Sequence, residues 1–477
     1  MAFLLFIVPL VMAGLALVTP SNRWRPWLIP AGGVAHLVLT GLALSGGPVS
    51  ALQGWLVLDP LGKLVLGLIS VLFVVCSYYA PAYLALRAER PNRFFCACLL
   101  AMLGMMTLVT LSHHLGLMWV AIEATTLATA PLLFFNHSPR SLEATWKYLL
   151  IGSVGIALAL LGTFFLAYSS IREGLAPTLL LDDLVRIAPQ LSGPWLHAAF
   201  VLLLVGYGTK MGLAPMHTWK PDAYGEAPGL VGALLAGGAT SCAFLAILRF
   251  YQICQAAPEA AFAREILVFM GLFSMAVAAV FMIRQRDFKR MLAYSSVEHM
   301  GILVLGIGLG GLATFGALLH LITNGVTKGV LFLSAGNIHR AYDSKLTDDV
   351  RGAIRRLPVS GVLFLAGFLV VTGSPPGGPF ISEFTILTGA VSGGHYAVAA
   401  LYLALLAIVF IGMGTTVLRV VQGVPSAQAA ATSYRDRPQL VIPILVFMGL
   451  SLLLGLYIPK PLNTMLHDAA AYLEVTP

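Results

Sequence analysis

Long apolar stretches separated by short polar segments recur along the whole chain. Fourteen of these stretches reach roughly 20 residues, the length that a helix needs to cross about 30 Å of hydrocarbon. Their approximate limits are 2–19, 27–46, 61–86, 94–111, 114–135, 141–168, 195–218, 229–252, 262–283, 291–309, 312–338, 358–391, 396–420 and 438–457. The pattern predicts an all-α integral membrane protein with about fourteen transmembrane helices.

Glycine and proline interrupt the seventh and twelfth stretches, which read "LLLVGYGTKMGLAPMHT" and "LAGFLVVTGSPPGGPFISEFTIL". Such breaks free backbone groups that lipid cannot satisfy, so they are tolerated where helices enclose water or an ion site. Five spans separate the two discontinuous helices, which predicts two inverted five-helix repeats. We therefore divide the chain into three N-terminal helices at 1–93, repeats at 94–252 and 253–421, and a last helix and tail at 422–477.

Composition excludes a soluble protein. The 477 residues are 58% hydrophobic and only 10% charged, with a mean hydropathy of +0.89. The five cysteines form no CxxC or Cys/His pattern, which argues against iron–sulfur and zinc sites. We expect no cofactor and no metal in this chain, so any redox chemistry belongs to a partner.

The net charge of +8 resides in short loops and not in one patch, which argues against nucleic-acid binding. Alternate loops hold nineteen Lys and Arg, with Lys220 and Lys289 counted among them, and the other loops hold four. The positive-inside rule then places both termini outside a bacterial or archaeal cytoplasmic membrane. An amphipathic segment at 178–191 is expected to lie along the outer surface.

Ionisable residues inside the apolar stretches point to function, because a charge at a helix centre costs about 2.5–3.5 kcal/mol on insertion scales. Glu123 and Lys210 lie deep in their stretches and have no counter-charge on their own helices. We expect them to pair with each other across the bundle. The pair is either a fixed structural contact or a switch whose opening lets Lys210 bind or release a proton.

A polar stripe runs along the stretch at 312–338, where His320, Asn324 and Lys328 follow at four-residue steps. Such a stripe can hold a file of water, so we expect a proton path that ends at Glu383, just past the second interruption.

Other polar residues in or beside the stretches carry weaker expectations. Glu143 and Lys147 have i,i+4 spacing and form either a local ion pair or part of the polar axis. His217 serves either proton uptake or a helix end. Arg249 lies near a helix end, which favours an anchor that extends to the interface. The adjacent pair Glu298 and His299 completes the secondary polar axis.

Five ordered motifs carry a resemblance over roughly residues 95–420: "GLMWVAIEATTLATAPLL", "GTKMGLAPMHTWKPDAYGEAPG", "RDFKRMLAYSSVEHMGI", "TKGVLFLSAGNI" and "VTGSPPGGPFISEFTIL". They resemble the antiporter-like proteins shared by respiratory complex I, multi-subunit sodium/proton antiporters and group 4 [NiFe] hydrogenases, and most of all the hydrogenase-4 component F branch. The resemblance implies a proton channel within a complex of membrane subunits and a peripheral redox arm. It also implies a nickel–iron site and iron–sulfur clusters in partner subunits.

The resemblance assigns proton-translocating roles to Glu123 and Lys210 in the first half, and to His320, Lys328 and Glu383 in the second. Two positions depart from it. The helix at 229–252 offers only Thr240, Ser241 and Cys242 where many relatives have lysine or histidine, and Asn324 stands where some have a second histidine.

We therefore expect a proton-translocating subunit of a hydrogenase or formate hydrogenlyase-like complex, embedded in lipid. The alternatives are a sodium/proton antiporter, a complex I or inorganic-carbon uptake subunit, or a non-conducting membrane scaffold.

Overall fold

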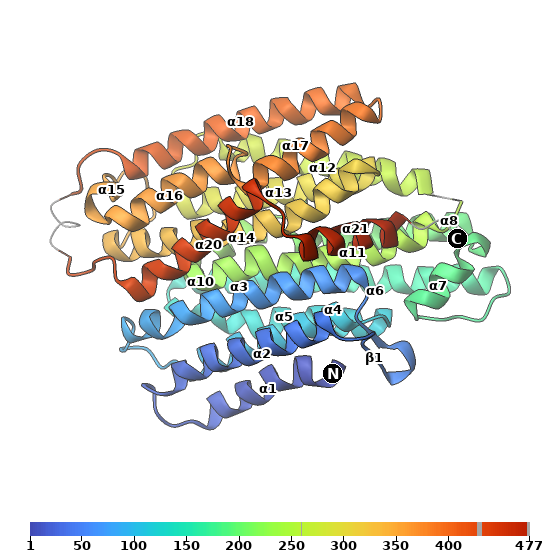
Figure 1. The fold of residues 1–477 in the computed structure, drawn as a ribbon, viewed down its shortest axis with the longest axis horizontal. Helices are drawn as coiled ribbons and strands as arrows, with labels where there is room; N and C mark the ends of the chain where they lie inside the picture. Colours follow the sequence, from blue (N-terminus) through green and yellow to red (C-terminus); the bar gives the residue numbers. More distant parts are fainter. Residues whose placement is uncertain (259, 427–431, 475–477) are drawn as a thin grey trace.

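The protein is a bundle of long helices that lie side by side (Figure 1). A computed structural model describes residues 1–258, 260–426 and 432–474. The helices of the first half are α1 (Ala2–Val18), α2 (Leu28–Ser45), α3 (Pro60–Ala85), α4 (Arg93–Leu111), α5 (Leu115–Leu133), α6 (Pro139–Arg172), α7 (Leu181–Ile187), α8 (Gly193–Met211), α9 (Trp219–Glu226), α10 (Gly229–Leu234), the π-helix η5 (Leu235–Ala239) and α11 (Thr240–Gln255). Those of the second half are α12 (Ala260–Met282), α13 (Phe288–Leu309), α14 (Leu312–Tyr342), α15 (Ala353–Arg356), α16 (Pro358–Val371), α17 (Gly378–Ser392), α18 (Tyr396–Val421), α20 (Pro438–Leu456) and α21 (Lys460–Glu474).

Eleven helices of the described chain are long and apolar enough to cross a membrane. Each coincides with one of the predicted stretches. The three remaining stretches correspond to α1, to α8 with the segment after it, and to α16 with α17. The protein is thus a multi-pass, all-helical membrane protein, and the total of fourteen crossings stays a prediction.

Both predicted helix interruptions are present. Gly212 ends α8 with a φ of 82° and donates to the Gly208 carbonyl at 2.7 Å, and α9 begins only at Trp219. Trp219 donates its indole N–H to the Thr209 carbonyl at 2.8 Å, which satisfies another open group. The second break has the same form, because α16 ends at Val371 and Gly373 adopts a φ of 73° before α17 starts.

The centre of the bundle is α14. Its whole apolar window is buried, and α13 and the α10–η5–α11 run are almost as fully enclosed. Close approach explains the π-helix: a methyl group at Gly237 would come 3.1 Å from the Gly325 carbonyl oxygen of α14. The helices with the most polar residues are therefore the ones most completely covered by others.

Two elements were not predicted. Strands β1 (Ser50–Ala51) and β2 (Leu56–Val57) form a small antiparallel hairpin. The tail after the last span folds into the amphipathic helix α21, which buries Leu466, Ala469 and Leu473 against the bundle. The expected amphipathic segment contains the short helix α7, and both chain ends lie toward the side of the bundle that carries α7 and β1 (Figure 1).

Arg249 corrects a prediction, because it does not extend to the interface. It is fully buried at the end of α11 and bonds to Asp59, the N-cap of α3, with Nη2 and Oδ2 3.0 Å apart. Its remaining N–H groups donate to the carbonyls of Val109, Thr110 and Ser112 at the end of α4, at 2.7–2.9 Å. The guanidinium therefore ties three helix ends together in a fully hydrogen-bonded contact.

We expect Arg249→Met to lower the free energy of unfolding by about 3–5 kcal/mol, because Asp59 would keep a buried charge without its partner. Thermal unfolding of the detergent-purified protein measures the loss. Adding Asp59→Asn should restore part of the stability, since the orphaned charge is then removed. An unchanged unfolding midpoint in Arg249→Met would contradict the assignment.

His113, in the segment between α4 and α5, joins the same contact. Its Nε2 lies 2.8 Å from Asp59 Oδ2, and its Nδ1 lies 3.5 Å from the carboxylate of Asp182 on α7. Burial lowers the pKa of His113, but the two carboxylates raise it by more, so the pKa lies above its usual 6.5. Burial raises the pKa of Asp59, but the charge of Arg249 and the bond from His113 bring it down to about 2.

These shifts predict how stability depends on pH. The stabilisation from protonated His113 is complete below its unfolded pKa of 6.5 and is lost as the pH rises through the higher folded value. The unfolding midpoint of the purified protein should therefore fall as the pH rises above neutrality. His113→Gln should remove this slope, and identical pH profiles for the two proteins would refute the prediction.

Candidate functional site

Glu123 on α5 and Lys210 on α8 form the ion pair that the sequence predicts, with 2.9 Å between Oε2 and Nζ. The ammonium also donates to Thr126 Oγ1, 2.5 Å away on α5, and lies 5.9 Å from the centre of the Tyr148 ring. Lys210 is buried, whereas the Glu123 side chain keeps 20% of its surface exposed. One partner of the pair is thus enclosed and the other reaches the flank of the bundle.

Glycines make the room that these ionisable groups occupy. A Cβ at Gly152 of α6 would come 2.8 Å from Lys210 Nζ. At the two helix breaks, a Cβ at Gly212 would overlap the side chain of Lys220, and one at Gly373 would overlap the carboxylate of Glu383. Each polar head group is therefore seated against backbone that carries no side chain.

A second cluster gathers on α13, α14 and α17. His299 Nδ1 lies 2.9 Å from His320 Nε2, and His320 Nδ1 lies 2.9 Å from Ser382 Oγ. Glu298 Oε2 lies 3.9 Å from the other nitrogen of His299. Glu383 belongs to the same group, because ligand atoms of His299, His320 and Glu383 lie within 4.8 Å of one another.

Lys328 and Lys220 meet neighbouring serines of α13. Lys328 on α14 donates to Ser295 Oγ at 2.6 Å, and Lys220 on α9 donates to Ser296 Oγ at 3.1 Å. The prediction that Lys220 lies in a loop is wrong, since the side chain is completely buried. Its place after a helix break was the available signal, because a discontinuous helix brings its following residues back into the bundle.

Glu143 and Lys147 lie apart from this buried row. Both are exposed, with Lys147 Nζ 2.6 Å from Glu143 and 2.9 Å from Asp222 of α9. They line one side of an open cavity of about 480 Å³ at the α15 end of the bundle. The structure thus places the i,i+4 pair at the surface, where it also contacts a second helix.

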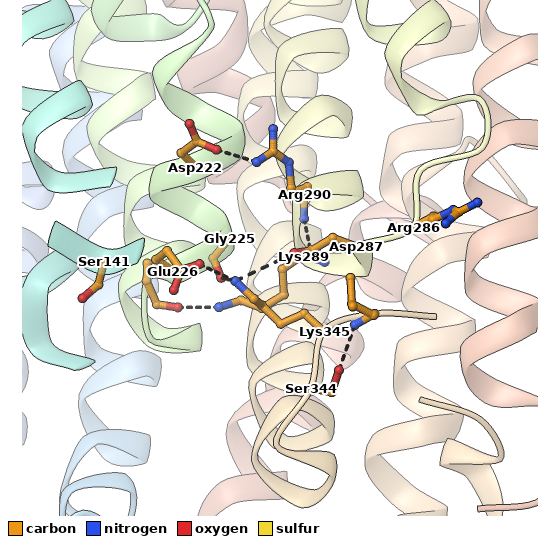
Figure 2. A network of polar contacts seen from close by, with 12 residues as sticks. Ser141, Asp222, Gly225, Glu226, Arg286, Asp287, Lys289, Arg290, Ser344 and Lys345 are labelled. Carbon is orange, nitrogen blue, oxygen red and sulfur yellow. Dashed lines mark hydrogen bonds and ion pairs between the residues drawn. The ribbon is translucent and has the colours of Figure 1, made fainter. Parts of the chain in front are cut away.

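A polar network lines the other side of this cavity (Figure 2). Arg290 and Asp222 are 2.5 Å apart, as are Lys345 and Glu226, so α9 is tied to the start of α13 and to the segment after α14. Lys289, also counted as a loop residue in the sequence, is buried and donates to the Ala227 carbonyl at 2.7 Å. These contacts fix the position of α9 and therefore of Lys220.

His217 and Asn324 are buried but stand aside from these contacts. His217 lies in the first helix break, and Asn324 lies on α14 between His320 and Lys328. In the described part of the chain, His217 Nδ1 and Asn324 Oδ1 have no hydrogen-bond partner.

The arrangement suits proton transfer. Imidazole, amine, carboxyl and hydroxyl groups each bind and release protons or pass them along hydrogen bonds, and they follow one another from α9 through α13 and α14 to α17. Two imidazoles and a carboxylate are also the ligand types of a metal ion. The shared hydrogen bond between His299 and His320 uses one nitrogen of each ring, which favours proton transfer within this cluster.

Residues 112–410 match the family described as NADH:quinone oxidoreductase/Mrp antiporter, TM. The chain belongs to this family. It is an antiporter-like membrane subunit of the type found in complex I, Mrp and hydrogenase complexes. A hydrogenase-4 component F homolog of Methylacidiphilum infernorum is 38% identical over 374 residues, which are 77% of this chain and 76% of that protein.

Two further relatives extend the family match over nearly the whole chain. NADH-quinone oxidoreductase subunit 14 of Thermus thermophilus is 30% identical over 459 residues, 94% of this chain and 99% of that protein. A chain in the Mrp complex of a Dietzia species superimposes with a TM-score of 0.86 at 20% identity, covering 99% of this chain and 97% of that one. At that identity the likeness shows the shared fold of the family.

The seat of Lys210 gives a direct test. In Gly152→Ala the added methyl should push the ammonium away from Glu123 and expose it. Labelling of Lys210 by an apolar amine-reactive reagent, followed by mass spectrometry, should then be faster than in the wild type. Gly449→Ala is the matched control, because a Cβ there meets nothing within 4 Å. Equal labelling rates in all three proteins would contradict the proposed seat.

Proposed function

We propose that this subunit translocates protons in a membrane-bound hydrogenase or formate hydrogenlyase-like respiratory complex. The observation that carries the proposal is the enclosed row of ionisable groups, which starts at the Glu123–Lys210 pair and ends at the His299–His320–Glu383 cluster. Such groups are costly inside a bundle, by about 2.5–3.5 kcal/mol each on insertion scales, and therefore indicate transport.

The Glu123–Lys210 pair is the switch in this scheme. Opening the pair removes the carboxylate that holds the charge of Lys210, so the ammonium gives up its proton, and closing the pair restores it. The second half receives the change through Lys328, and the imidazoles of His299 and His320 pass protons by exchanging the hydrogen bond between them. Glu383 is the terminal carboxylate of the path.

Redox chemistry belongs to the partners in this proposal. A nickel–iron site and iron–sulfur clusters lie in attached subunits, and their turnover opens and closes the Glu123–Lys210 pair. The similarity to a hydrogenase-4 component F homolog supports this choice of complex. The positive-inside asymmetry supports an orientation in the bacterial or archaeal cytoplasmic membrane with both termini outside.

A sodium/proton antiporter subunit is the second candidate, favoured by the family match and by the close superposition on the Mrp complex. A complex I or inorganic-carbon uptake subunit would keep the same proton path with other partners. A passive scaffold is disfavoured, because it has no use for buried carboxylates such as Glu298 and Glu383.

Lys210→Ala should abolish proton movement while the complex still assembles, because the switch loses its cation. The complex is purified through a tag on this chain and reconstituted in vesicles that contain a pH dye. A potassium diffusion potential then drives the protons, so no electron donor needs to be known. Lys328→Met should have the same effect, and the exposed Lys460→Ala should not. Wild-type flux in both buried-lysine variants would refute the proposal.

The same preparation identifies the complex. Mass spectrometry of the co-purifying subunits should find a nickel–iron large subunit. A flux that requires sodium would favour the antiporter candidate instead.

A further inference from the structure

Lys220 is a buried lysine that the path from Glu123 to Glu383 leaves without a task. It is completely enclosed, and its ammonium donates to a neutral hydroxyl, Ser296 Oγ, at 3.1 Å. The centre of the Tyr224 ring lies 5.7 Å away. Within the described residues no carboxylate pairs with it, in contrast to Lys210. A lysine buried among neutral groups is costly to keep charged and is therefore ready to release a proton.

Its position joins the two halves of the protein. Lys220 is carried by α9, and its side chain folds back onto Gly212, two residues beyond Lys210 on the chain of α8. Its head group reaches α13 at Ser296, and the preceding residue Ser295 accepts from Lys328. The two buried lysines thus contact adjacent positions of one helix.

The helix expected to supply the link offers no free group. On α11, Thr240 and Ser241 donate to the carbonyls of Ala236 and Gly237 in the preceding turn, at 2.7 and 2.6 Å. The thiol of Cys242 faces the Met106 carbonyl at 3.7 Å. These side chains are occupied by local backbone contacts, so the gap between the halves has to be filled from another element.

The two helix breaks support the same assignment. Each break turns at a glycine of positive φ, and each of these glycines seats one ionisable side chain from the helix that follows: Gly212 seats Lys220, and Gly373 seats Glu383. Lys220 is therefore the first-half counterpart of the carboxylate that ends the path in the second half.

We propose that Lys220 carries the proton between the Glu123–Lys210 pair and Lys328. The neutral amine of Lys220 gains an N–H bond as one at Lys210 is broken, and it later gives this proton up toward Lys328 by way of the hydroxyls on α13 or water. The positive charge moves with the proton, and nothing is oxidised or reduced. This inference rests on the proposed proton translocation and names a residue that completes it.

The test uses the whole complex in dye-loaded vesicles with an imposed potassium diffusion potential. Lys220→Met keeps the length of the side chain and removes the amine, and we expect it to lower the proton flux by at least about a hundredfold, in the range of a lost proton-transfer group. Lys220→His restores a group that titrates, so it should recover part of the flux with a more acidic pH profile. Ser241→Ala is the control, because its hydroxyl serves only its own helix.

The outcomes separate this inference from the proposed function. If Lys210→Ala and Lys328→Met lose flux while Lys220→Met keeps the wild-type rate, the relay at Lys220 is wrong and the translocation stands. Loss of flux in Ser241→Ala with retention in Lys220→Met would assign the link to α11. A Lys220→His protein that is as inactive as Lys220→Met, although assembled, would reduce Lys220 to a structural role and overturn the proposal.

Discussion

A charge can lie inside a membrane protein only where the protein replaces the water that lipid excludes. This constraint is met to different degrees along the chain. Arg249 is saturated by a carboxylate and three carbonyls, so it has no reason to change its state. Lys210 has one carboxylate and one hydroxyl, and Lys220 has a single hydroxyl. In the described chain, Glu298 and Glu383 each keep a buried oxygen without a partner. The number of fixed partners therefore separates the cation that holds helices together from the groups suited to exchanging protons.

Backbone geometry creates these environments. A continuous helix would fill the space at Gly212 and Gly373 with side chains, whereas the interruptions open a concave stretch of backbone against which Lys220 and Glu383 rest. Protein encloses both breaks, so the freed peptide groups find partners such as Trp219 and never face lipid. The ion-pair network around Asp222 and Lys345 holds α9 at one end of the bundle and so fixes where Lys220 points (Figure 2).

Local sequence was sufficient for the features that depend on local composition. Apolar length predicted the spans, and glycine with proline predicted both breaks. The Glu123–Lys210 pair was predictable because neither residue had another partner nearby. Contacts between distant segments were not: Arg249 and Asp59 are 190 residues apart, and nothing near Arg249 announces its carboxylate. Lys220 was counted as a loop residue because the segment around it is polar, and only the tertiary fold buries it. The helix α21 escaped because its apolar face is too narrow to span a membrane.

The complete enclosure of α14 limits how another protein can influence this one. No neighbouring chain can touch His320 or Lys328, which are walled off on every side. Glu123 differs, since its helix turns Val120 and Leu127 outward beside it. An adjoining subunit thus has a handle on the first member of the row and none on its middle. Information from outside must arrive at the rim and travel inward as displaced charge, which makes the protein a one-dimensional conductor with an addressable terminal.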